Sequence, residues 1–242
     1  MKDLEQRVEQ AVRHFWRTRQ RQAENQGRAS GRKDYGSRGA VTGGKQIDGF
    51  TRLMSELLQE SGLPGGTIHL EKRRVVLPGW FRPTKEWDLI AVVDGVLLAT
   101  VEFKSQVGSF GNNFNNRTEE AIGNATDIQI AYREGAFRGS PRPWCGYFML
   151  LEDSPGSRTR VEVKEPHYQV FPEFRNSSYA DRYRILCEKL VRERLYDAAC
   201  LLLSDKKGGL RGVYSEPSGE VGFRNFATSL TAHAMAFARL RK

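Results

Sequence analysis

Two short apolar runs, at residues 89–93 and 96–101, are separated only by the dipeptide Asp94-Gly95. An Asp-Gly pair between apolar runs of this length is a strong signal for a β-hairpin. Both runs are almost continuously apolar, and such strands are usually buried on both faces by packed helices. The sequence therefore predicts a hairpin inside an α/β sheet.

Charged residues stand at the ends of these buried runs: Asp88 precedes the first, and Glu102 and Lys104 follow the second. Charges on a buried strand pair are costly unless they are paired or bind a metal. Asp88, Glu102 and the backbone carbonyl of Phe103 are predicted ligands of Mg²⁺. Lys104 would orient a water and stabilise the charge on a phosphate, which indicates phosphodiester cleavage. The alternative is an ordinary hairpin in which Glu102 and Lys104 are solvated edge charges.

The register of the hairpin decides whether these side chains meet. A two-residue Asp-Gly loop would place Asp88 and Glu102 on opposite faces of the sheet. A three-residue loop of residues 93–95, with the glycine left-handed in a bulge, would set Asp88 opposite Thr100 and diagonal to Glu102, about 7–8 Å away. Lys104 lies two residues further on and shares that face. We therefore predict the three-residue bulged loop.

The 242-residue chain carries a formal net charge of +9, and its 39% hydrophobic content is enough for a core. The positive excess is concentrated in residues 13–45, which hold nine basic residues against two acidic ones. Such a patch attracts polyanions and gives salt-dependent binding. We expect this segment to contact nucleic acid, and the alternative is a solvated, disordered basic arm.

The three cysteines are scattered, without CxxC spacing, which is typical of reduced thiols in a core: Cys145, Cys187 and Cys200. The N-terminus is charged and lacks the apolar segment of a signal peptide. The chain has no apolar run long enough to span a membrane. We expect a cytoplasmic protein.

Hydrophobic periodicity outlines the remaining elements. Helices are expected at 1–26, 46–60, about 118–133, 183–203 and 225–240, and strands at 67–76 and 145–151. A mobile, basic, glycine-rich loop is expected at 27–45 and a polar loop at 105–117. We predict one domain over 1–242, with a mixed central sheet flanked by helices, appended N- and C-terminal helices, a catalytic core at 46–152 and a mainly helical part at 153–242.

The pattern of Asp88 followed by Glu102-x-Lys104 resembles the PD-(D/E)xK nuclease superfamily, although Trp87 stands where that motif has proline. A closer resemblance is to the XhoI family of type II restriction endonucleases. It is strongest over 87–127, which includes Glu-Phe-Lys-Ser-Gln from position 102 and the distinctive Phe-Gly-Asn-Asn-Phe-Asn-Asn-Arg from position 110.

The resemblance implies a restriction-endonuclease-like fold and a bacterial, Mg²⁺-dependent homodimer that cuts both strands of double-stranded DNA at a palindrome. In this family the palindrome would be CTCGAG, cut to leave 5′-phosphate ends with 5′ overhangs, and a cognate DNA methyltransferase would be the functional partner. Two other functions stay open: a repair or recombination nuclease without a fixed sequence, and a basic nucleic-acid-binding protein without catalysis.

Candidate DNA contacts come from two segments. Asparagine pairs with adenine and arginine with guanine in the major groove, which favours the run after the catalytic strand: Asn112, Asn113, Asn115, Asn116 and Arg117. The alternative is that these asparagines only shape a loop through Asx turns. The basic segment offers further contacts: Arg28, Arg32, Lys33 and Arg38. A further acidic metal ligand could come from Glu56, Glu60 or Glu119.

Overall fold

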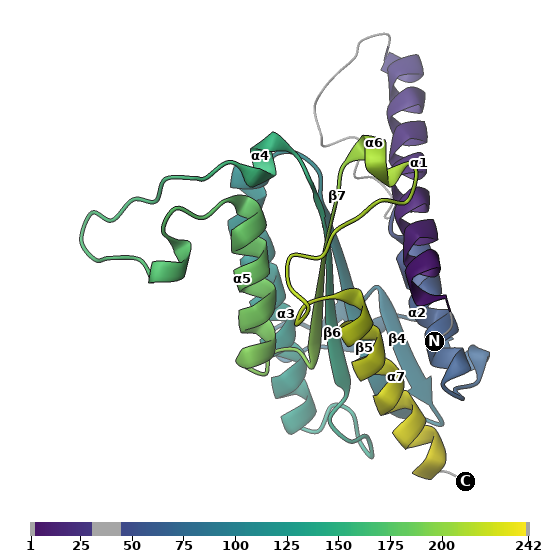
Figure 1. The fold of residues 1–242 in the computed structure, drawn as a ribbon. Coiled ribbons are helices and arrows are strands. Elements are labelled where there is room, and N and C mark those ends of the chain that lie inside the picture. The colour runs from purple at the N-terminus through teal and green to yellow at the C-terminus, as the bar shows by residue number, and fades with distance from the viewer. Residues whose placement is uncertain (1–2, 31–44, 241–242) are drawn as a thin grey trace.

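A computed structural model describes residues 3–30 and 45–240, with the backbone alone at 26–30. Its centre is a five-stranded sheet in the order β1-β4-β5-β6-β7 (Figure 1). The strands are β1 (Ile68–His69), β4 (Leu89–Val93), β5 (Val96–Gln106), β6 (Trp144–Glu152) and β7 (Ala198–Ser204). β1, β4 and β5 pair antiparallel, whereas β5, β6 and β7 are parallel. The predicted mixed sheet is confirmed.

Helices cover both faces of the sheet, as the apolar hairpin predicts (Figure 1). One face packs against α1 (Leu4–Ser30), α2 (Asp48–Glu60) and α7 (Phe223–Leu240). The other packs against α3 (Phe110–Arg133) and α5 (Tyr179–Arg192). Two separate apolar cores result, divided by the sheet. Short helices α4 (Pro155–Arg158), α6 (Lys206–Gly209), η2 (Gly65–Thr67) and η3 (Pro172–Phe174) complete the connections.

The helix expected at 183–203 is wrong in its second half. α5 ends at Arg192, and residues 198–204 form β7, in which every residue is buried. Alanine and leucine favour a helix locally, but these residues pair in parallel with β6 and lie between the helices of both faces. Tertiary packing therefore overrides local propensity, and the part at 153–242 contains a strand of the main sheet.

The strand expected at 67–76 is also wrong. Only Ile68–His69 pair with β4, and the charged residues after them form a turn in which the Arg74 N–H donates to the Glu71 carbonyl at 2.7 Å. The chain then makes a separate two-stranded hairpin from β2 (Val76–Pro78) and β3 (Thr84–Glu86). This hairpin was not predicted, and it leads the chain into the β4–β5 strand pair.

The N-terminal helix continues to Ser30, four residues beyond its expected end, so residues 27–30 are helical and not part of a loop. Its predicted apolar stripe is buried against the core, including Val8, Val12, Phe15 and Trp16. Arg28 belongs to the last turn of this helix. The other three arginine and lysine candidates of this segment, Arg32, Lys33 and Arg38, lie outside the described residues.

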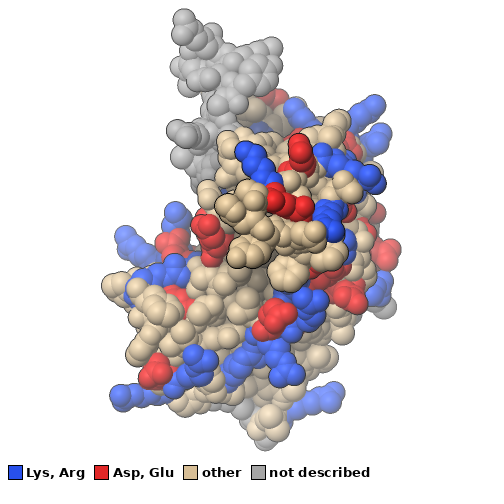
Figure 2. Space-filling model, turned by 90° about the vertical axis from the view of Figure 1, so that its left-hand side faces the viewer, with Lys and Arg blue, Asp and Glu red and all other residues tan. Residues whose placement is uncertain are grey.

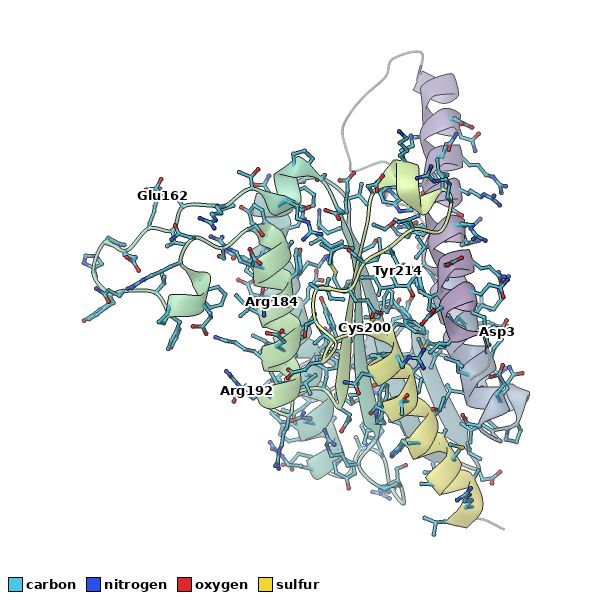
Figure 3. The ribbon with its side chains drawn as sticks, in the orientation of Figure 1. Asp3, Glu162, Arg184, Arg192, Cys200 and Tyr214 are labelled. Atoms are coloured by element: carbon cyan, nitrogen blue, oxygen red, sulfur yellow. The ribbon has the colours of Figure 1, made fainter. Side chains whose placement is uncertain are left out.

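The cysteines are free and buried, as predicted. Cys200 lies on β7 inside the molecule (Figure 3), where burial raises the pKa of its thiol well above the usual value. Within the described residues, no helix is long and apolar enough to cross a membrane. The chain between α4 and α5 projects from the body and carries Glu162 (Figure 3).

Lysine and arginine side chains are interspersed with acidic ones over the face shown in Figure 2. On α5, two of them pair with acids: Arg184 with Glu188 at 2.8 Å, and Lys189 with Glu173 at 2.6 Å. Basic side chains that are already neutralised in this way attract a polyanion weakly.

Candidate active site

The turn of the central hairpin contains two residues, not the three that we predicted. Val93 pairs with Val96 across Asp94 and Gly95, whose φ angles of 48° and 80° are both left-handed. Such a pair of positive φ values is typical of the type I′ turn that Asp-Gly favours. The three-residue loop is therefore wrong.

The extra residue is present elsewhere, as a bulge inside β5. Val92 pairs with Leu97 but Ala91 pairs with Ala99, so Leu98 has no partner of its own on β4. Leu98 and Ala99 consequently both belong to the core beneath α1, α2 and α7. A bulge of this kind shifts the register by one residue and reverses the faces beyond it. Without it, Glu102 and Lys104 would point into that core.

The shifted register brings the two predicted carboxylates side by side. Leu89 pairs with Val101, so the next pair along the strands sets Asp88 opposite Glu102. On β5, Val101 and Phe103 face the α1/α2/α7 core, which leaves Glu102 and Lys104 on the α3 side. Glu102 is therefore beside Asp88 directly, and not diagonal to it across Thr100 as we predicted.

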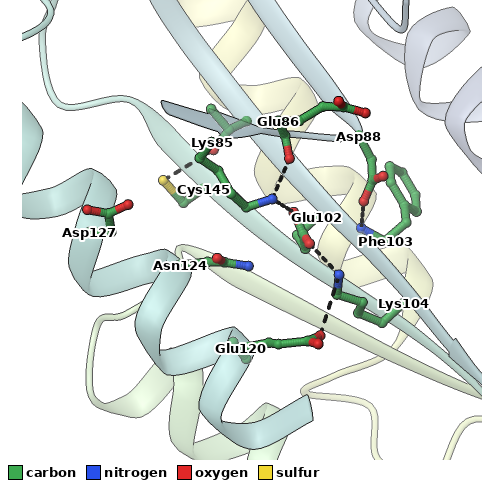
Figure 4. Close-up of polar contacts among 12 residues, drawn as sticks. Lys85, Glu86, Asp88, Glu102, Phe103, Lys104, Glu120, Asn124, Asp127 and Cys145 are labelled. Atoms are coloured by element: carbon green, nitrogen blue, oxygen red, sulfur yellow. Dashed lines mark hydrogen bonds and ion pairs between the residues drawn. The ribbon is translucent and has the colours of Figure 1, made fainter. Parts of the chain in front are cut away.

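Glu102 is buried, with 2% of its surface exposed, and a lysine contacts each of its oxygens (Figure 4). Lys104 Nζ lies 2.5 Å from Oε1, and Lys85 Nζ lies 2.9 Å from Oε2. Lys85 belongs to β3, and its ammonium also lies 4.9 Å from the centroid of the Trp87 ring. Burial lowers the pKa of Lys104, but the negative charge of Glu102 outweighs this and raises it above the usual value. Lys104 is therefore an ammonium at neutral pH.

Asp88 precedes β4, and part of its surface is exposed although its carboxyl group lies in a largely desolvated position. It makes no ion pair within the described part of the chain. Its Oδ2 accepts a hydrogen bond from the Phe103 N–H at 2.7 Å. Desolvation of the carboxyl group and then the charge of Glu102 raise the pKa of Asp88 to about 6, against the Phe103 hydrogen bond and the two lysines. Neighbouring carboxylates that repel each other in this way are a setting that a divalent cation stabilises.

The backbone of Phe103 points to the same edge. In an extended strand, the N–H and C=O of one residue lie on the same side, which is how a residue pair exchanges two hydrogen bonds. The N–H of Phe103 is directed at Asp88, beyond the last residue of β4, so its carbonyl is directed there too. Two carboxylates and one carbonyl are the kind of oxygen ligands that Mg²⁺ takes, with several waters retained. Among residues 3–25 and 45–240, no three His, Cys, Asp or Glu side chains cluster as metal ligands, so the carbonyl and waters would complete this set.

A third carboxylate, on α3, lies near Lys104. Glu120 Oε2 lies 3.6 Å from Lys104 Nζ (Figure 4). The same oxygen lies 2.6 Å from Arg117 Nη1. Glu120 is adjacent to Glu119, one of the three acids considered from the sequence. The other two, Glu56 and Glu60, lie on α2 and pair with Arg7 of α1 at 2.8 Å each.

The asparagine run is helical. α3 begins at Phe110, so the polar loop expected at 105–117 is wrong: β5 continues to Gln106, and the loop is residues 107–109. Asn112, Asn115 and Asn116 are exposed on the first turns of α3. Asn113 differs, because its Nδ2 donates to the Ser109 carbonyl at 2.8 Å. Arg117 is half-buried and paired with Glu120. Helix spacing thus places amides on one outward face, three to four residues apart.

Lys85 and the β2–β3 hairpin were missed by the sequence reasoning. The hairpin is tied to α3 by Asp127, whose Oδ1 accepts from the N–H groups of Trp80 and Phe81 and whose Oδ2 accepts from Arg82 Nε at 2.7 Å. The alternation Thr-Lys-Glu-Trp before Asp88 was the available signal for a strand. No sequence pattern indicated that Lys85 pairs with Glu102.

Comparison with known proteins identifies the family of this chain. The family model for restriction endonuclease XhoI matches residues 26–216. The type II restriction enzyme BstVI of Geobacillus stearothermophilus is 52% identical over 218 residues, which cover 88% of this chain and 96% of that enzyme. The chain belongs to the XhoI restriction endonuclease family.

Two further similar proteins are also type II restriction enzymes. AbrI of Azospirillum brasilense is 48% identical over 168 residues, covering 69% of this chain and 75% of AbrI. XhoI of Xanthomonas vasicola is 42% identical over 182 residues, covering 74% of this chain and 72% of XhoI. No solved structure matches the chain. Type II restriction enzymes are site-specific endonucleases, so the chain is a member of a family of DNA-cutting enzymes.

Proposed function

We propose that residues 1–242 form one endonuclease domain that acts as a homodimer and cuts both strands of DNA at CTCGAG, leaving 5′-phosphate ends with 5′ overhangs. The contact of Glu102 with Lys104 beside Asp88 is the observation that carries the catalytic part of the proposal. The target sequence rests on the family resemblance and on the relative that is named XhoI. A cognate DNA methyltransferase would protect the bacterial host.

The fit of the site to Mg²⁺ rests on its donor set. Asp88, Glu102 and the Phe103 carbonyl are hard oxygen ligands at one strand edge. The pKa of Asp88 is raised by desolvation and then by the charge of Glu102, and both effects favour a cation beside its carboxylate. A bound Mg²⁺ would lower the pKa of a coordinated water and neutralise charge on the phosphate. Asp88 and Glu102 would hold it there.

Lys104 acts as a charge, not as a base. Because its pKa is raised, its ammonium keeps its proton at neutral pH and can donate hydrogen bonds to the attacking water and to a phosphate oxygen. It therefore orients the nucleophile and stabilises the additional negative charge of the five-coordinate phosphorus. The N–H of Phe103 holds the Asp88 carboxylate in place through its 2.7 Å hydrogen bond.

The homodimer would match the twofold symmetry of a palindrome, with one active site on each strand. The exposed amides of Asn112, Asn115 and Asn116 are the candidates for contact with the bases or backbone, since they follow the catalytic strand directly. Asn113 and Arg117 make contacts within the chain, so we assign them to the support of this face. Arg28, Arg32, Lys33 and Arg38 remain candidates for phosphate contact.

The deciding experiment is digestion of unmethylated phage DNA with Mg²⁺ beside an EDTA control, followed by sequencing of the cut ends. Discrete Mg²⁺-dependent fragments that end at CTCGAG support the whole proposal. Discrete ends at another sequence would keep the mechanism and reject the target. A smear would indicate a nuclease without fixed sequence, and an absence of cutting would reject catalysis.

A further inference from the structure

The tip of the β2–β3 hairpin exposes two adjacent aromatic side chains. Trp80 is 52% exposed and Phe81 is 70% exposed, whereas the three other tryptophans, Trp16, Trp87 and Trp144, are at most 4% exposed. Large apolar side chains that are exposed together commonly mark a contact surface. This tip is outside both segments that sequence reasoning assigned to DNA.

The tip has a fixed shape. Asp127 on α3 accepts hydrogen bonds from the N–H groups of Trp80 and Phe81 at 2.7 and 2.8 Å, so both residues are held by their backbone. Arg82 adds hydrogen bonds to the same aspartate and to Asn124, each at 2.7 Å. Gly79 is required here, since a Cβ at this position would lie 2.6 Å from the Asp127 carboxylate. A rigid aromatic tip loses little conformational entropy on binding.

Strand β3 connects the tip to the candidate active site. Lys85, four residues beyond Phe81 on β3, contacts the buried Glu102 at 2.9 Å. Residues 81–83 bend before β3 begins, so these four residues span at most the length of an extended chain, about 13 Å or roughly four base-pair steps of a duplex. The Trp87 N–H donates to the Val75 carbonyl at 2.9 Å and closes the base of the hairpin. A duplex whose scissile phosphate occupies the site would therefore pass within reach of the tip.

The positive charge of residues 71–86 favours nucleic acid as the partner that contacts the aromatic tip. Residues 71–86 contain five basic residues against two acidic ones. Arg82 and Lys85 are paired with Asp127 and Glu102. The other three lie exposed in the turn before β2: Lys72, Arg73 and Arg74. Arg82 stands directly beside the aromatic pair. A basic hairpin with aromatic residues at its end is complementary to nucleic acid, whose phosphates attract the cations and whose sugars and bases offer apolar contact.

We propose that the segment of residues 71–86, the basic turn and the β2–β3 hairpin together, is a DNA-contacting element, in which Trp80 and Phe81 pack against the duplex within about four base pairs of the scissile phosphate while Lys72, Arg73 and Arg74 contact its backbone. This rests on the proposed function and adds a contact surface to it. The surface is separate from the asparagine face of α3, although α3 supports both.

Trp80 provides its own reporter, because the other three tryptophans are buried. Tryptophan emission of the full chain is recorded while a CTCGAG duplex is added with Ca²⁺ in place of Mg²⁺, and binding is followed in parallel by the anisotropy of a labelled duplex. The unmodified chain is expected to show a quench or shift that saturates with binding. Trp80→Phe is expected to bind normally and lose that signal. Trp16→Phe is the matched control and keeps it.

The double variant Trp80→Ala/Phe81→Ala tests the energetic contribution. We expect binding to weaken about tenfold to hundredfold and KM to rise, with kcat at saturating DNA within about twofold of the unmodified chain. Thermal unfolding is expected to be unchanged, since both side chains are exposed. Lys72→Gln/Arg73→Gln/Arg74→Gln is expected to reduce the dependence of affinity on salt.

Three results would overturn the inference while cleavage by the unmodified chain is intact. These are an unchanged emission at saturating DNA, unchanged affinity in the double alanine variant, and a shift of that variant from dimer to monomer in sedimentation, which would assign the tip to a second copy. If the unmodified chain neither binds nor cuts DNA, the proposed function fails first and the inference with it.

Discussion

The Nζ of Lys85 lies 2.9 Å from the Oε2 of Glu102, so a lysine from a separate hairpin is bound to the carboxylate that the proposed metal requires. Lys104 occupies the other oxygen. In the absence of a metal the two ammonium groups compensate a carboxylate that is 2% exposed. Binding of a cation at Glu102 must therefore compete with at least one lysine.

This competition predicts the behaviour of Lys85→Met. Loss of one cation leaves Glu102 less compensated, and the metal-free protein should be destabilised by about 1–3 kcal/mol. Mg²⁺ should restore more stability to the variant than to the unmodified chain, because the metal replaces the missing charge. Urea unfolding with and without Mg²⁺ measures both values. Lys72→Met, in the exposed turn before β2, serves as the control, and equal Mg²⁺ effects in the two variants would contradict the prediction.

Asp88 and Glu86 form a matched pair of carboxylates two residues apart. Asp88→Asn should reduce cleavage by about a hundredfold to a thousandfold, a loss of the size seen when one group that stabilises the transition state is removed. Binding of DNA should persist and remain sensitive to salt. Glu86→Gln should cut nearly as fast as the unmodified chain, because Glu86 is exposed and only its backbone carbonyl contacts Lys85. Single-turnover cleavage and a gel-shift assay separate the two effects.

The asparagines of α3 should divide into two classes. Asn112→Ala and Asn116→Ala remove exposed amides and should slow cleavage at least about tenfold, the cost of one lost base contact, with no change in melting temperature. Asn113→Ala removes the hydrogen bond to the Ser109 carbonyl and should lower stability by about 1 kcal/mol. Melting curves and cleavage rates of the three variants test this division. A fall in stability without a fall in rate for Asn112→Ala would place that residue outside the DNA contact.

Asp127 makes stability depend on pH in a defined direction. Burial raises its pKa, but the hydrogen bonds from Phe81, Arg82 and Trp80 outweigh this and hold the pKa below the usual 3.8. A depressed pKa gives stability that is present above about pH 4 and lost as the pH falls further. Asp127→Asn should therefore cost about 1–3 kcal/mol at pH 7 and less at pH 3. Urea unfolding at both values is the test, and a cost that is equal at the two would exclude the carboxylate charge as its source.

The turn glycine can be compared with a glycine in open space. An added Cβ at Gly95 or at Gly66 would meet no atom within 4 Å, but Gly95 has a φ of +80°. Gly95→Ala should therefore destabilise the protein by about 1–2 kcal/mol through backbone strain alone. Gly66→Ala, in the middle of η2, should change stability by less than about 0.5 kcal/mol. Thermal unfolding of both variants gives the comparison, and equal effects would refute the role assigned to the left-handed turn.

The hairpin illustrates what the sequence could and could not specify. The requirement for one extra residue between Asp88 and Glu102 followed from the two-residue period of a strand. The place of that residue did not, because a bulge at Leu98 and a longer turn satisfy the same period. Only the packing of Leu98 and Ala99 into one core distinguishes the two.

Other failures have the same physical origin. The stretch at 198–203 has helix-forming residues and becomes a strand because β6 offers it a partner. The run at 110–117 contains four asparagines, which usually favour turns, yet it begins α3 directly after the catalytic strand. The role of Lys85 was missed because its partner Glu102 is distant in sequence, and because the hairpin that carries Lys85 to Glu102 was not predicted.

Glu120 touches both Lys104 and Arg117, and so joins the proposed catalytic lysine to the helix that bears the exposed amides. In the proposed enzyme, Glu120 would therefore affect both the choice of the target sequence and the rate of cleavage. Retargeting the enzyme by exchanging α3 residues would disturb the lysine along with the base contacts. Altered specificity would come with lower turnover unless positions 117 and 120 are redesigned with the asparagine face.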